Sequence, residues 1–136
     1  MNVICVPTSE VRAAWSRVRH LLLPAIERSH GRWTTDYVLA ALALGEQTLW
    51  VAINDNEIVG VATVQISFYP ERKMLAIHFL GGNEFGEWYE PMLKSLTQYG
   101  KANGCYAIEC NARHGFWKYF KNDGFEKAST FYEKVI

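Results

Sequence analysis

The stretch that decides the fold is Lys73–Cys110, which reads KMLAIHFLGGNEFGEWYEPMLKSLTQYGKANGCYAIEC. Its first part, Lys73–Leu80, has the period of two that is typical of a strand. This alternation predicts two faces, one with Leu75, Ile77 and Phe79 and the other with Ala76, His78 and Leu80. A Gly-Gly-Asn break follows and ends the predicted strand.

The second part of the stretch predicts a long amphipathic helix and another strand. The helix is expected to end at Gly104, and Tyr106–Cys110 form the strand directly behind it. The apolar positions that mark the helix recur every three or four residues and are Trp88, Met92, Leu93, Leu96 and Tyr99. Two strands that are joined by one crossover helix run parallel in a sheet.

The residues upstream predict two helices and an antiparallel hairpin. The expected elements are a strand Asn2–Val6, a helix Glu10–Leu23 that Pro24 ends or kinks, a helix from Thr34 or Thr35 to Gly45, and strands Thr48–Ile53 and Glu57–Ser67. The second helix should turn Tyr37, Val38, Ala41 and Leu42 inward. Asp55 and the asparagines beside it tolerate positive φ, which predicts a tight turn between the two hairpin strands.

Downstream, His114–Asn122 predict a short aromatic helix, and Thr130–Ile136 alternate as a terminal strand. The order of elements predicts an α/β (α+β) fold with a mixed central sheet, a β-α-β core and helices on both faces. A chain of 136 residues, 49% of them hydrophobic, has room for one core. We therefore expect a single domain over residues 1–136.

Composition argues against several classes of function. Lys plus Arg and Asp plus Glu are 14 each, so no basic field would attract nucleic acid. No apolar run approaches the roughly 20 residues of a membrane span, and the N-terminus lacks a secretory pattern, so a cytoplasmic protein is expected. The cysteines Cys5, Cys105 and Cys110 form no disulfide framework and, with the histidines, match no zinc spacing. No metal is therefore expected.

Three stretches together carry a family resemblance. They are Trp50–Ile53 with Asp55–Ala62, Leu93–Leu96 with Ala102–Cys105, and Phe116–Phe125. In this order they resemble the second and third strands, the central helix ending in Gly-Cys, and the closing helix with its Gly-Phe signature of the GNAT superfamily. The resemblance spans essentially the whole chain. It implies the GNAT fold, with acetyl-CoA as acyl donor and an amine, on a small molecule or a protein, as acceptor.

The resemblance also implies where acetyl-CoA would lie. Its candidate contacts, where the parallel strands part, are Phe79, Leu80, Gly81, Gly82, Gly86 and Arg113. The family binds pyrophosphate on free N–H groups of a glycine-rich loop before the central helix. Counting back from Gly104 places Glu84–Tyr89 there, where bulky or acidic residues replace glycine and two carboxylates would repel phosphate. An alternative alignment uses Gly81, Gly82 and Gly86 as the anion loop.

The catalytic residues are implied in the same way. Many members protonate the leaving thiolate with a tyrosine where this chain has Phe120, so the neighbouring Tyr119 is the candidate acid, provided that the helix is rotated or distorted. The candidate general bases are Glu109 and His78. The alternatives are that Glu109 is a solvated strand residue and that His78 is a hydrogen-bonded edge histidine.

Two readings of function follow from this pattern. Arg32 and Trp33 lie between the first two helices, where the family binds the acceptor, and are candidate substrate contacts. The first reading is therefore a divergent acyl-CoA N-acyltransferase. The second is a GNAT-fold binding protein without acyl transfer, which Phe120 and the loss of loop glycines favour. The ending Arg113–Trp117 and the loop Gly81–Trp88 resemble GNAT-like proteins of tailed phages. In that reading the chain is phage-encoded, and its partners are virion proteins or a second copy in a homodimer.

Overall fold

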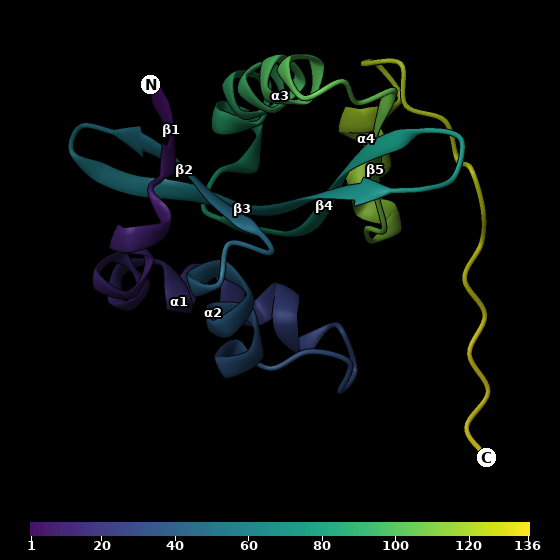
Figure 1. The fold of residues 1–136 in the computed structure, drawn as a ribbon, viewed down its shortest axis with the longest axis horizontal. Coiled ribbons are helices and arrows are strands. Elements are labelled where there is room, and N and C mark those ends of the chain that lie inside the picture. Colours follow the sequence, from purple (N-terminus) through teal and green to yellow (C-terminus); the bar gives the residue numbers. More distant parts are fainter.

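A computed structural model describes residues 1–136 as a five-stranded sheet, in the order β1-β2-β3-β4-β5, with helices on both faces (Figure 1). The elements are β1 (Asn2–Val6), α1 (Val11–Glu27), α2 (Thr35–Ala43), β2 (Thr48–Asn54), β3 (Glu57–Phe68), β4 (Lys73–Gly82), α3 (Phe85–Ala102), β5 (Ala107–Cys110) and α4 (Trp117–Phe120). Neighbouring strands pair antiparallel except for β4 and β5, which are parallel. The mixed α/β architecture and the parallel β4–α3–β5 unit confirm the prediction from Lys73–Cys110.

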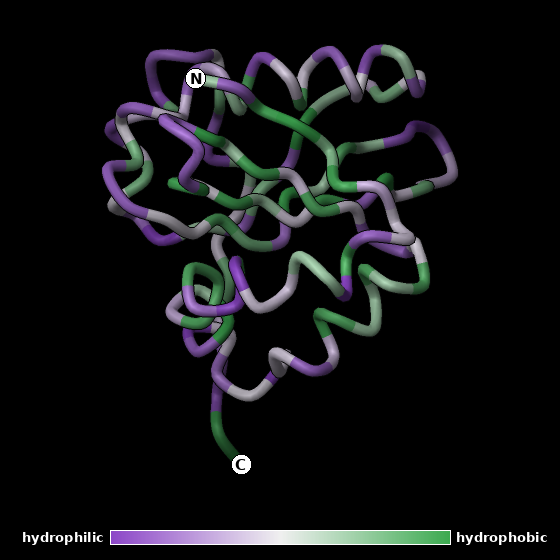
Figure 2. Tube along the Cα trace, turned by 90° about the vertical axis from the view of Figure 1, so that its left-hand side faces the viewer, coloured by the Kyte–Doolittle hydropathy of each residue, from purple (hydrophilic) through white to green (hydrophobic).

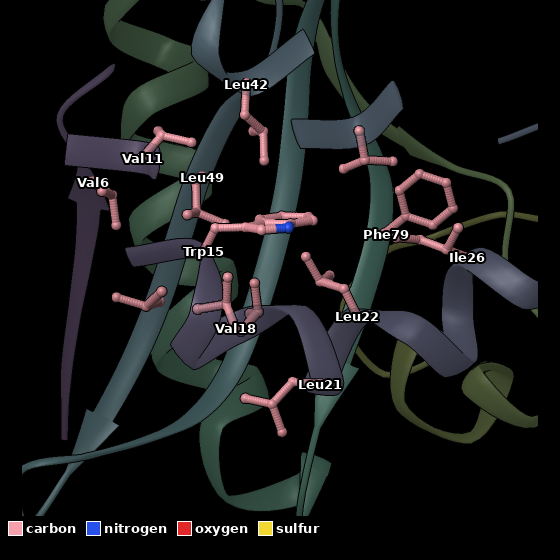
Figure 3. Close-up of a cluster of buried hydrophobic side chains, with 13 residues drawn as sticks. Val6, Val11, Trp15, Val18, Leu21, Leu22, Ile26, Leu42, Leu49 and Phe79 are labelled. Carbon is pink, nitrogen blue, oxygen red and sulfur yellow. The ribbon is translucent and has the colours of Figure 1, made fainter. Parts of the chain in front are cut away.

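The core has two parts, one on each face of the sheet. Under α1 and α2, Trp15 lies among aliphatic side chains from α1, α2 and the strands (Figure 3). On the other face, Trp88 and Met92 of α3 pack on the strands. Apolar positions colour the strands green in Figure 2, with polar residues mostly at the outer turns. No helix combines the length and the apolar character that crossing a membrane requires.

Burial decides details of the helices that local pattern does not. Helix α1 continues through Pro24 to Glu27, so the predicted end at Leu23 is wrong. Proline removes one backbone donor there, but Ile26 is only 3% exposed, and its burial holds the last turn in place. At the start of α2, the Thr34 hydroxyl accepts a hydrogen bond of 3.1 Å from the Tyr37 amide. Thr34 therefore caps the helix at its predicted beginning. The Tyr37 side chain is 65% exposed, so its predicted inward direction is wrong.

The strands reproduce the predicted hairpin, and a bulge interrupts the alternation of β4. Asp55 and Asn56 have φ of 50° and 65°, as a two-residue hairpin turn requires. Between β3 and β4, Thr63 lies opposite Phe79 and Val64 opposite Ile77, so His78 is an extra residue on β4. Beyond this bulge the faces exchange. Phe79 packs in the cluster under α1, whereas Leu75 and Ile77 pack under α3, so the predicted shared face of these three residues is wrong.

The predicted terminal strand Thr130–Ile136 is not formed. The segment has no strand pairing, and Tyr132, Val135 and Ile136 are more than 80% exposed. Figure 1 shows the C-terminus far from the sheet. An alternating pattern fits a segment for pairing, but the structure shows no strand beside it. The segment instead contacts Arg32, whose guanidinium lies 2.7 Å from the Glu133 carboxylate and 4.9 Å from the centre of the Phe131 ring.

Deletion of Thr130–Ile136 is expected to change the free energy of unfolding by less than about 0.5 kcal/mol, because the removed side chains are exposed. Denaturant unfolding of the full-length and shortened chains measures this difference. A shortened chain that unfolds several kcal/mol more easily would mean that the segment does pair with the domain in solution.

Candidate functional site

The site begins where β4 and β5 part. Their parallel register runs from Met74 opposite Ala107 to Ile77 opposite Cys110. Strand β5 ends there, but β4 continues to Gly82. The last part of β4 therefore has an edge without a strand neighbour, whose backbone groups can pair with an extended ligand. Burial raises the pKa of the Cys110 thiol to about 12, so the cysteine beside this opening stays protonated.

A pocket of about 400 Å³ opens beside this edge. Its walls include Leu80, Gly81 and Gly82 of β4, which were predicted to contact the cofactor. Arg113 and Tyr119, also predicted from sequence, line the same pocket. The other lining residues are Leu21, Pro24, Ala25, Arg28, Phe85, Trp88, Gly115, Phe116 and Lys118. Positively charged and aromatic side chains thus surround the pocket, and no Asp or Glu lines it.

The two glycines at the end of β4 are required by close packing. A Cβ on Gly81 would lie 2.0 Å from the Leu21 carbonyl oxygen of α1, and a Cβ on Gly82 would lie 2.2 Å from that of Val59. Gly82 also has φ of 146°. Both glycines are paired with β3 rather than lying in a loop. Gly86 is the second residue of α3, with Tyr119 as its neighbour at ordinary contact distance.

The beginning of α3 carries negative charge. Glu84, with φ of 52°, precedes the helix, and Glu87 lies in its first turn. The charge of Glu84, together with a hydrogen bond between the two carboxyl groups, raises the pKa of Glu87. The prediction of a loop over Glu84–Tyr89 is wrong, because only Glu84 precedes the helix and the rest of that stretch begins α3. Both carboxyl groups nevertheless lie at the helix N-terminus. An anion at that end would meet two carboxyl groups.

The aromatic helix α4 turns its two candidate positions in different directions. Phe120 is 8% exposed and packs on Phe125, with ring centres 4.6 Å apart. Tyr119 points instead to the pocket and lies 4.8 Å, centre to centre, from the Phe85 ring. Consecutive residues of a helix point about 100° apart, so Tyr119 faces the pocket while Phe120 stays in the core.

A second group of polar residues lies on the α1 and α2 face of the sheet. The bulge in β4 places His78 there, with its Nε2 atom 2.8 Å from the Gln65 Oε1 atom of β3. The Trp33 ring lies 5.6 Å from the His78 ring. The Tyr69 hydroxyl donates a hydrogen bond of 2.8 Å to the Glu109 carboxylate on β5, and this raises the pKa of Tyr69. The structure thus brings His78, Glu109 and Trp33 to the same face.

The tautomer and the charge of His78 follow from these contacts. Because the Gln65 Oε1 atom can only accept, the His78 Nε2 atom must carry the proton, which leaves Nδ1 as an acceptor. Burial lowers the pKa of His78, and the negative charge of Glu109 acts in the opposite direction. The imidazole is therefore neutral at pH 7. No three His, Cys, Asp or Glu side chains gather closely enough to hold a metal ion.

Some predicted residues do not line the pocket. Phe79 is 7% exposed in the core under α1, with its ring 6.0 Å from that of Trp33. Arg32 contacts the C-terminal segment through Glu133. Sequence reasoning did not select Arg28, Gln65 or Tyr69, which occupy a helix end, a strand and a turn without a distinguishing local pattern.

Solved structures of acetyltransferases share this architecture. One from Trypanosoma brucei is 14% identical, with 99% of each chain covered and a TM-score of 0.66. A predicted acetyltransferase from Clostridium acetobutylicum, solved with acetyl-CoA, is 16% identical, with 98% of this chain and 95% of that one covered and a TM-score of 0.69. An aminoglycoside acetyltransferase from an uncultured soil metagenomic sample is 19% identical, with 99% and 98% covered and a TM-score of 0.69.

The chain has the GNAT acetyltransferase fold. No protein-family model matches the sequence, and no curated protein does. The likeness to these acetyltransferases therefore lies in the fold. Within this acetyltransferase fold, the free edge of β4 begins beside His78 and ends at the cationic pocket, which residues of α1, β4, α3 and α4 line. The pocket can bind an anion, and His78 can accept a proton.

Proposed function

We propose that the protein is an acyl-CoA-dependent N-acyltransferase that moves an acetyl group to an amine. The observation that carries this proposal is the free edge of β4, which begins beside His78 and ends at the cationic pocket. The neighbour from Clostridium acetobutylicum, which shares the fold, was solved with acetyl-CoA. Acetyl-CoA fits the pocket's chemistry because it combines an extended amide arm with phosphates.

The acceptor face suits an ammonium group. The Glu109 carboxylate attracts the charged amine and stabilises the positive charge that His78 gains when it takes a proton. The Trp33 ring offers an aromatic surface beside His78. The free Nδ1 atom of neutral His78 then takes a proton from the amine, directly or through a water molecule. Gln65 holds the imidazole in the tautomer that makes this possible.

The free edge of β4 and the pocket at its end would hold the acyl donor. When bound, acetyl-CoA supplies an acetyl thioester, so that an amide bond forms as the carbon–sulfur bond breaks. The backbone groups of β4 orient the extended arm of the donor. Tyr119 lines the pocket with the Lys118 ammonium 5.1 Å from its ring, so it would contact the end of the donor that carries the phosphates, and the departing sulfur would take its proton from solvent. Phe85 and Trp88 supply apolar walls to the same pocket.

A second candidate is a binding protein that has the fold but does not transfer an acyl group. The observations that favour it are the carboxyl groups of Glu84 and Glu87 at the start of α3 and the burial of Phe120. Release of free thiol from acetyl-CoA, measured with a panel of small amines and lysine peptides, separates the two candidates. Amine-dependent thiol release supports the transferase, and its absence with every amine supports the binding protein.

The rate of transfer is expected to fall at acidic pH as His78 gains a proton. Burial lowers the pKa of His78 from its ordinary value of 6.5, so the neutral form predominates at and above that pH. The ratio kcat/KM should therefore drop only when the pH falls below about 6.5, and the variant His78→Gln should lack this drop. A pH profile of kcat/KM checks the expectation. An identical acidic limb in the variant would exclude His78 as the titrating group.

A further inference from the structure

Three positive side chains surround one pocket without a counter-charge. They are Arg28 at the end of α1, Arg113 after β5 and Lys118 on α4. None of them lies within 4.0 Å of a carboxylate oxygen. The ion pair of the structure joins Arg32 and Glu133 instead. All three residues are exposed, come from separate segments and line the same cavity. Their mutual repulsion would be offset by a bound anion.

Two of these cations are held in place by aromatic rings. The Arg113 guanidinium lies 5.3 Å from the centre of the Phe116 ring, and the Lys118 ammonium lies 5.1 Å from that of Tyr119. Such contacts orient a cation but leave its charge uncompensated. Both side chains therefore remain available to an anionic ligand.

The beginning of α3 has the opposite charge. The N-terminus of a helix ordinarily attracts phosphate through its free N–H groups. Here Glu84 and Glu87 lie at that end, and the negative charge of Glu84 raises the pKa of Glu87. A phosphate on the helix N-terminus would be repelled by these carboxylates, whereas the pocket has no acidic lining residue.

We propose that the phosphates of the acyl donor are bound by the side chains of Arg28, Arg113 and Lys118, in place of the N-terminal N–H groups of α3. This inference rests on the proposed function for the identity of the ligand. The pocket begins at Leu80 and Gly82, where the free edge of β4 ends, so a pantetheine arm along that edge brings the attached phosphates to the three cations. Side-chain cations then supply the charge that backbone groups supply in a glycine-rich loop.

Binding of CoA by the wild type and by single variants tests the inference. Calorimetry should give a Kd that rises about ten-fold for each of Arg28→Ala, Arg113→Ala and Lys118→Ala, since a charge-assisted contact is lost each time. Matched controls are Arg12→Ala on α1 and Lys94→Ala on α3, whose side chains are exposed away from the pocket and should leave the Kd unchanged. Circular dichroism melting confirms that each variant is folded. Adenosine 3′,5′-bisphosphate serves as a second probe that carries phosphates without the pantetheine arm.

The outcomes separate this inference from the proposed function. If the three variants bind CoA as the wild type does, or if the wild type binds neither CoA nor the bisphosphate, the inference is wrong. Acetyl-pantetheine, which has no phosphates at all, tests transfer by the wild type alone. Binding of CoA through the three cations with no transfer from either thioester would uphold the inference and reject the transferase. Transfer with CoA binding that is insensitive to the three substitutions would do the reverse.

Discussion

Replacement of Trp88 by alanine is expected to lower the free energy of unfolding by about 3–5 kcal/mol, the cost of removing a large buried aromatic side chain. Trp88 is 1% exposed, and its indole N–H donates to the Asn83 carbonyl at 3.0 Å. Its ring fits against Gly60, where a Cβ would come within 2.2 Å of it, so α3 rests on β3 through this contact. The substitution would leave a cavity between the helix and the sheet.

Denaturant unfolding of Trp88→Ala measures this loss. The matched control is Trp117→Ala, because Trp117 is only partly buried and lies against the exposed Lys127 ammonium. The control should lose clearly less stability than Trp88→Ala. Equal losses in the two variants would contradict the central position that the structure gives to Trp88.

The largest effect on activity is expected at the acceptor face. Glu109→Gln and His78→Gln should each lower kcat about 100-fold, the low end of what a positioned acid or base contributes. Glutamine keeps an oxygen that can accept from the Tyr69 hydroxyl, so Glu109→Gln removes the charge with little change in shape. Initial rates of thiol release at saturating acetyl-CoA and amine give kcat directly.

Glu57→Gln is the matched control for this prediction, because Glu57 is an exposed carboxylate at the start of β3, at the opposite end of that strand from the Tyr69 turn. It should retain the wild-type kcat. Unchanged turnover in Glu109→Gln would exclude that carboxylate from catalysis and leave it as a strand residue with a hydrogen bond to Tyr69.

Local patterns were sufficient where one segment determines its own structure. The β4–α3–β5 unit follows from a change of period between Lys73 and Cys110, and the turn at Asp55 and Asn56 follows from their tolerance of positive φ. Patterns failed where packing decides. The bulge at His78 is invisible in an alternating sequence, because an extra strand residue is defined only by its partners on β3. Likewise the alternation of Thr130–Ile136 cannot say whether a strand edge lies beside it.

The candidate site was predictable only in part, for the same reason. His78 and Glu109 lie on strands that the sequence predicts to be neighbours, so their proximity could be anticipated. Arg28 and Lys118 are 90 positions apart in the sequence, and only the packing of α1 and α4 around β4 brings them to one pocket.

Calorimetric titration with acetyl-CoA tests the central claim most directly, because binding of the donor involves both the β4 edge and the three cations. The account predicts saturable one-to-one binding that weakens as salt is added, since phosphates meet the charges of Arg28, Arg113 and Lys118. Absence of any heat of binding at millimolar acetyl-CoA would contradict it, and the fold would then serve a role other than acyl transfer.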